Sequence, residues 1–95
     1  MWDLDEARRI VLEGLRPHAA RVWLFGSRAR GEPGRASDID VAVLPEGPLP
    51  AGLLQEIREA LENSQILYPV QLVDLTTAEP SLREAVLREG VPWTN

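Results

Sequence analysis

Acidic and apolar residues alternate along the segment Asp38–Val43. Side chains of a β-strand point to its two faces in turn, so this spacing predicts a strand with Asp38 and Asp40 on one face and Ile39 and Val41 on the other. Two like charges side by side are unfavourable unless something compensates them. The fold therefore has to bury the aliphatic face of this strand and either solvate the acidic pair or neutralise it.

Apolar periodicity predicts three helices and two further strands around this segment. We expect helices at about residues 3–16 and 51–63, a last helix with Pro80 in its first turn and Gly90 at its C-terminal end, and strands at 22–25 and 68–75. Asp5, Arg9 and Glu13 lie at four-residue steps on the first helix and predict surface ion pairs. With no internal repeat or linker, the order α-β-β-α-β-α indicates one α+β domain over residues 1–95.

A chain of 95 residues can build only one small core. Such a chain buries roughly 60 to 65% of the surface that its unfolded form exposes, so association with another chain, as an oligomer or with a partner, is expected. Trp2 and Trp93 stand near the two ends of the sequence. They either pack on each other or form an apolar patch for another chain.

The charge and composition exclude several classes of function. The net charge of -5 disfavours non-specific binding to nucleic acid, which normally needs a basic excess. Cysteine is absent, which excludes disulfides and thiolate metal sites and makes the cytoplasm the expected compartment. No apolar run approaches the roughly 20 residues of a membrane span, so no membrane association is expected.

A turn with anion-binding chemistry follows the apolar strand at residues 22–25. Gly26 permits a tight turn, and Ser27 can cap a following helical turn whose free N–H groups point outward. Arg28 and Arg30 would add positive charge, so together these residues would suit the phosphates of a nucleotide. The alternative interpretation is a turn without a binding role.

The acidic pair at Asp38 and Asp40 predicts a metal site, because a hard cation such as Mg²⁺ prefers oxygen ligands and keeps open positions for phosphate oxygens. The alternative is that both aspartates are solvated on an exposed sheet face. A connection of ten residues separates Ser27 from Asp38, which brings the anion-binding turn and the acidic pair into one motif.

LFGSRARG followed by SDIDVAV resembles the signature of the DNA polymerase beta-like nucleotidyltransferase superfamily, and in particular its minimal nucleotidyltransferases. The resemblance implies a mixed β-sheet flanked by helices, with Gly26 and Ser27 on the triphosphate and Asp38 and Asp40 coordinating two Mg²⁺ ions. It further implies transfer of a nucleoside monophosphate from a nucleoside triphosphate, ATP by expectation, to an acceptor hydroxyl.

Minimal nucleotidyltransferases are typically paired with a small helical HEPN-domain protein as antitoxin to a toxin ribonuclease. The resemblance therefore suggests a tyrosine of such a partner as the acceptor. The alternative is a non-catalytic antitoxin subunit that binds nucleotide or partner without transferring anything.

A third carboxylate from a later strand completes the site in this family, and the sequence leaves its identity open. Asp74 is the only acid in the strand at residues 68–75, and it is the predicted third catalytic and metal-binding residue. Gln71, three residues earlier, stands where many relatives carry an aspartate. The two face opposite sides of a regular strand, and a glutamine could serve neither as base nor as strong Mg²⁺ ligand.

Overall fold

A computed structural model of the chain describes residues 2–26, 29 and 38–94. Three helices and four strands follow one another as α1 (Trp2–Leu15), β1 (Ala20–Phe25), β2 (Ile39–Pro45), α2 (Leu53–Glu62), β3 (Val70–Asp74), α3 (Pro80–Glu89) and β4 (Val91–Pro92). The predicted order of elements is confirmed, and β4 is added at its end. Within these described ranges, none of the helices combines the length and the apolarity needed to cross a bilayer.

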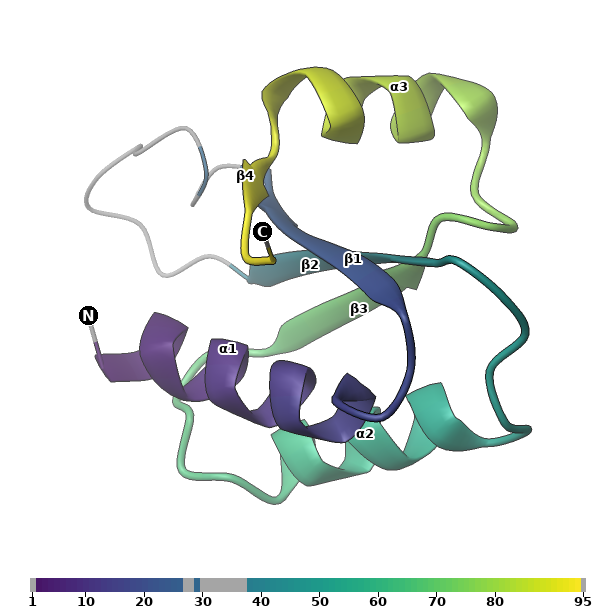
Figure 1. The fold of residues 1–95 in the computed structure, drawn as a ribbon. Helices are drawn as coiled ribbons and strands as arrows, with labels where there is room; N and C mark the ends of the chain where they lie inside the picture. The colour runs from purple at the N-terminus through teal and green to yellow at the C-terminus, as the bar shows by residue number, and fades with distance from the viewer. Residues whose placement is uncertain (1, 27–28, 30–37, 95) are drawn as a thin grey trace.

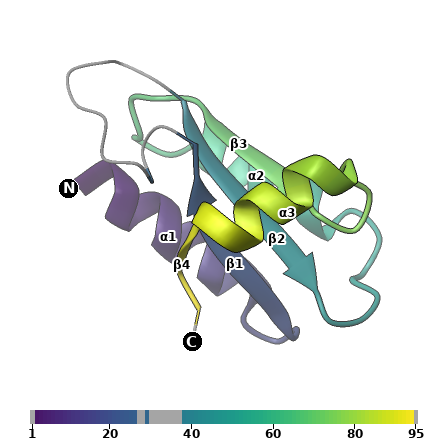
Figure 2. The same cartoon turned by 90° about the horizontal axis from the view of Figure 1, so that it is seen from above.

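The four strands form one mixed sheet in the spatial order β3-β2-β1-β4. Strand β1 runs antiparallel to both β2 and β4, whereas β2 and β3 are parallel and are joined through α2. Helices α1 and α2 cover one face of the sheet and α3 covers the other (Figures 1 and 2). The α+β class and the mixed sheet flanked by helices are thus as expected.

The main core lies between the sheet and the α1–α2 layer. Its strand residues share the face opposite to that of the acidic pair, and include Val22, Leu24, Ile39, Val41, Val43 and Leu72. Ala7, Val11 and Leu15 of α1 and Ile57 and Leu61 of α2 close this core from the helical side. The aliphatic side chains of β2 are therefore buried. Burial of apolar surface stabilises by about 25 cal/mol per Å², and it is the main contribution that holds the helices against the sheet.

A smaller cluster packs on the other face, beneath α3. It contains Trp23, Ala42, Leu75 and Val86, with Phe25, Leu44, Val73, Ala78 and Leu82 around it. By the period of two, Asp38 and Asp40 lie on the same face of β2 as Ala42. The acidic pair is therefore on the α3 side of the sheet, beyond the edge of this cluster.

Strand β4 was not predicted from the sequence, and its pairing with β1 determines where Trp93 lies. Val91 and Pro92 pair with β1, and the Trp93 amide donates a hydrogen bond to the Val22 carbonyl at 2.8 Å. Trp93 is buried in the main core, and its carbonyl accepts a bond from Arg8 Nη2 at 3.2 Å. The prediction of an exposed patch is therefore wrong for Trp93, while the side chain of Trp2 lies outside what the structure describes.

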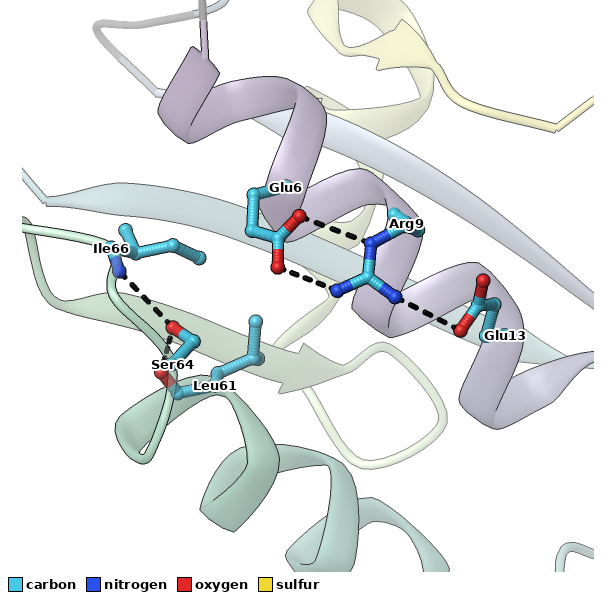
Figure 3. Close-up of polar contacts among 6 residues, drawn as sticks. All are labelled: Glu6, Arg9, Glu13, Leu61, Ser64 and Ile66. Carbon is cyan, nitrogen blue, oxygen red and sulfur yellow. Dashed lines mark hydrogen bonds and ion pairs between the residues drawn. The ribbon is translucent and has the colours of Figure 1, made fainter.

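The polar face of α1 carries the ion pairs expected of it, with one change of partner. Arg9 Nη1 lies 3.1 Å from Glu13 Oε1, and the rest of the Arg9 guanidinium binds the Glu6 carboxylate rather than Asp5 (Figure 3). Glu6 precedes Arg9 by three residues, a spacing that brings side chains together as well as four does. Because solvent screens them, these exposed pairs add little to stability, and they are unrelated to the acidic pair.

Candidate active site

The predicted acidic pair stands at the end of the sheet where β1 finishes and β2 and β3 begin. Asp38 is exposed and immediately precedes β2, and the half-buried Asp40 is the second residue of that strand. Asp40 lies opposite Phe25 of β1 and beside Gln71 of β3. Asp40 is thus flanked by residues of two neighbouring strands, and Asp38 is the more exposed of the two aspartates.

Gly26 brings the predicted phosphate turn against this pair. Its φ of 78° is in the left-handed region, and a Cβ at this position would collide with the Asp40 carboxylate. The Gly26 carbonyl accepts a hydrogen bond from the Ala29 amide at 3.1 Å, which closes a turn directly after β1. Glycine is therefore favoured here for two reasons, since a side chain would strain the backbone angle and would push the Asp40 carboxylate aside.

The other residues predicted to bind phosphate, Ser27, Arg28 and Arg30, lie outside the described residues, so their roles stay predictions. The structure shows where the chain leaves β1, which is at Gly26. Gly26 lies next to the Asp40 carboxylate, so the predicted phosphate-binding residues follow directly after a residue at the acidic pair.

Gln71 is the third side chain at this site. Its Nε2 donates a hydrogen bond to Asp38 Oδ2 at 3.3 Å, and its backbone is in register with Asp40. Paired residues of parallel strands point to the same face of the sheet, so Gln71 belongs to the face of the two aspartates. The position beside the acidic pair on β3 is therefore occupied by a neutral amide.

Asp74, the predicted third catalytic and metal-binding carboxylate, lies away from the acidic pair. It pairs with Val43, three residues further along β2 than Asp40, and it alternates onto the α1–α2 face of the sheet with Leu72. Its Oδ1 accepts a hydrogen bond from the Thr76 amide at 2.8 Å. The strand is regular through this stretch, so no bulge turns Asp74 toward the acidic pair.

Instead, Asp74 lines a cavity of about 610 Å³ between the β2–α2 connection and α2, together with Arg58 and Thr76. A smaller cavity of about 170 Å³ lies beside the acidic site, between the end of β1 and α3. Its wall is apolar apart from one acid, and consists of Phe25, Gly26, Ala29, Leu82, Ala85, Val86 and Glu89. Sequence reasoning missed this second cavity, because it exists only through the packing of α3 against β1.

The environment of Asp40 disfavours its charge. Burial raises the pKa of the Asp40 carboxyl above its ordinary value, and the negative charge of Asp38 raises that pKa further. The folded protein therefore binds a proton at Asp40 more readily than the unfolded chain does. Keeping this carboxylate ionised at neutral pH costs stability unless a cation is bound.

Asp40→Asn is accordingly expected to increase the free energy of unfolding at pH 7 in the absence of divalent ions. Because the folded pKa is raised, the wild-type chain gains stability as the pH falls through that pKa toward the unfolded value, about 3.9. The advantage of Asp40→Asn should then shrink on acidification. Urea denaturation of both proteins in EDTA at pH 7 and at pH 4 measures this difference in the free energy of unfolding. If Asp40→Asn is no more stable than wild type at pH 7, or if its extra stability grows at pH 4, then burial and the charge of Asp38 are not what raises the pKa of Asp40.

The acidic pair can hold a metal ion only with help from another molecule. Throughout the part of the chain that the structure describes, no group of three or more histidine, cysteine, aspartate or glutamate side chains could bind a metal. Asp38 and Asp40 nevertheless offer two adjacent hard oxygen ligands, which suit Mg²⁺ when phosphate oxygens complete its octahedral shell. The site therefore fits a cation that arrives with a phosphorylated substrate.

A family model described as polymerase beta, nucleotidyltransferase matches residues 14–92 of the chain. The chain belongs to this nucleotidyltransferase family. The matched range contains the Gly26 turn, both aspartates and Gln71, so the site described above lies entirely inside the family's domain.

Two proteins named as protein adenylyltransferase MntA are similar to this nucleotidyltransferase. The one from Shewanella oneidensis is 36% identical over 95 residues, covering 95% of this chain and 65% of the relative. The one from Haemophilus influenzae, named as a probable adenylyltransferase, is 33% identical over 78 residues, covering 82% of this chain and 68% of the relative. The chain thus spans about two thirds of the length of each.

Solved structures share the fold. A structure described as a minimal nucleotidyltransferase superposes with a TM-score of 0.73 at 37% identity, covering 94% of this chain and 91% of that one. A chain in a structure described as a tri-AMPylated HEPN toxin of Shewanella oneidensis in complex with an MNT antitoxin superposes with a TM-score of 0.67 at 28% identity. The match covers 96% of this chain and 71% of that one. A chain in a structure described as a toxin-antitoxin with AMP-PNP superposes with a TM-score of 0.65 at 30% identity. The match covers 93% of this chain and 73% of that one.

Proposed function

We propose that this chain transfers a nucleoside monophosphate from a nucleoside triphosphate, ATP in the first instance, to an acceptor hydroxyl. The contact between Gly26 and the Asp40 carboxylate carries the proposal, because it joins the start of the phosphate-binding segment to the metal-binding pair. In the reaction, the acceptor oxygen bonds to the α-phosphorus and the bond from that phosphorus to pyrophosphate breaks. The hydroxyl proton passes to solvent.

Mg²⁺ is the proposed cofactor, held by Asp38 and Asp40. When bound, it would neutralise phosphate charge and so favour departure of pyrophosphate. The two aspartates would orient the nucleotide through that ion. The apolar cavity between β1 and α3 adjoins the same turn. Positioning and charge neutralisation are the main contributions that such a site makes to phosphoryl transfer.

We propose a tyrosine of a helical HEPN-type protein as the acceptor, which would make this chain an antitoxin of the cytoplasm. The similarity to MntA adenylyltransferases supports the reaction, and the similarity to an MNT antitoxin in complex with a tri-AMPylated HEPN toxin supports the partner. Asp38 is exposed, as a residue that meets a partner's acceptor has to be.

Intact-mass spectrometry tests this function directly. After incubation of the chain with ATP, Mg²⁺ and a HEPN-type partner, we expect the partner to gain the mass of one or more adenosine monophosphate groups. A partner in which the tyrosine is replaced by phenylalanine is the control and should gain nothing. An unchanged partner mass with every nucleoside triphosphate would refute the enzymatic proposal.

A second function, an antitoxin that neutralises its partner by binding alone, is favoured by one observation, the presence of Gln71 where a carboxylate could assist the reaction. Asp38→Asn combined with Asp40→Asn separates the two functions. If the partner is still neutralised by this double variant and no nucleotide is transferred by the wild-type chain, neutralisation by binding is the correct account.

A further inference from the structure

Among the described residues, the functional site offers two carboxylates and one neutral amide as ligands for divalent ions. The described polar side chains that β2 and β3 bring together there are Asp38, Asp40 and Gln71, which together carry two negative charges. Two ions in a shared phosphoryl-transfer site lie about 3.5 to 4 Å apart and bring four positive charges. The triphosphate offsets this charge and supplies oxygens to both ions, but each ion also needs oxygen ligands from the protein to be held in the site.

Gln71 reduces the capacity of the site in two ways. Its amide is neutral, so it adds no charge at the position beside Asp40 on β3. Its Nε2 also donates to Asp38 Oδ2, which engages an oxygen that would otherwise be free for a cation. Asp74 cannot replace the missing charge, because it lies on the opposite face of the sheet and accepts its bond from the Thr76 amide.

One ion would remove the repulsion between the two aspartates. The neutral amide of Gln71, in register with Asp40, provides no further carboxylate for a second ion.

We infer that this chain holds one divalent ion with its nucleotide, rather than the two that its family resemblance implies, and that Gln71 sets this limit. The inference rests on the proposed function, because it concerns the same nucleotide site. Gln71→Glu is the sharpest variant for testing it, since glutamate has the shape of glutamine and adds one negative charge beside Asp38.

Equilibrium dialysis of the full chain with Mn²⁺ measures the limit. The chain is mixed with an equal amount of an ATP analogue whose α,β bridging oxygen is replaced by methylene, and bound Mn²⁺ and nucleotide are counted per chain. We expect one ion for the wild type. For Gln71→Glu and Gln71→Asp we expect a second ion, bound at least about tenfold more tightly than any second ion of the wild type.

Asp74→Asn is the matched control and should hold one ion, because its side chain faces α2. Two ions on the wild type, or one ion on both Gln71 variants with folding confirmed by thermal melting, would overturn the inference while leaving the proposed function intact. Nucleotide bound without any ion, or no nucleotide bound at all, would instead refute the metal-nucleotide site on which the proposed function rests.

Discussion

Asp38→Asn and Asp40→Asn are each expected to lower nucleotide transfer to a partner by about 10²–10³-fold, the range that removal of one preorganised electrostatic group typically costs. Asparagine keeps the shape of aspartate and removes its charge, so the loss reports on charge rather than on packing. The effect should be larger at Asp40, which is held between Phe25 and Gln71, than at the more exposed Asp38. Incorporation of label from α-labelled ATP measures it.

Asp74→Asn is the control for this prediction. It removes the same charge from the neighbouring strand, but its side chain lies on the other face of the sheet and keeps an oxygen for the Thr76 amide. Transfer should stay within about twofold of wild type, as for a surface substitution remote from the site. Loss of transfer in Asp74→Asn, with Asp38→Asn and Asp40→Asn unaffected, would show that the site had been placed on the wrong face.

Much of the fold could be predicted from local patterns. The amphipathic spacing of α1 and α2, the unbroken apolar run of β1 and the alternation of β2 each appear in the sequence because one face of each element must be buried. Strand β4 could not be predicted in this way. Val91 and Pro92 are too few to show a period, and they become a strand only by pairing with Leu24 and Trp23 of β1.

The acidic pair and the glycine turn were also predictable, since both depend on neighbours close in sequence. The residue that stands third at the site could not be predicted. The choice between Gln71 and Asp74 depends on the register of the parallel strands β2 and β3, which are separated in the sequence by α2. That register places Gln71 beside Asp40 and Asp74 beside Val43. A shift of one residue would exchange the faces, so only tertiary structure could decide between them.

Gly26→Ala is expected to lower transfer by about 100-fold, because misplacing reacting groups by about 1 Å can cost that much. Alanine in the left-handed region, at φ of 78°, is strained by roughly 1–2 kcal/mol, and its Cβ would in addition displace the Asp40 carboxylate. The variant should therefore lose both stability and activity. Urea denaturation and transfer of labelled nucleotide measure the two effects separately.

Gly52→Ala separates strain from collision. Gly52, at the start of α2, has a φ of 83°, yet a Cβ there would meet nothing within 4 Å. Both variants should lose a similar part of their stability through backbone strain, whereas only Gly26→Ala should lose activity beyond its unfolded fraction. Equal activity in the two folded variants would mean that the Asp40 carboxylate can move aside without consequence, and that close contact between the glycine turn and the acidic pair is not what positions the nucleotide.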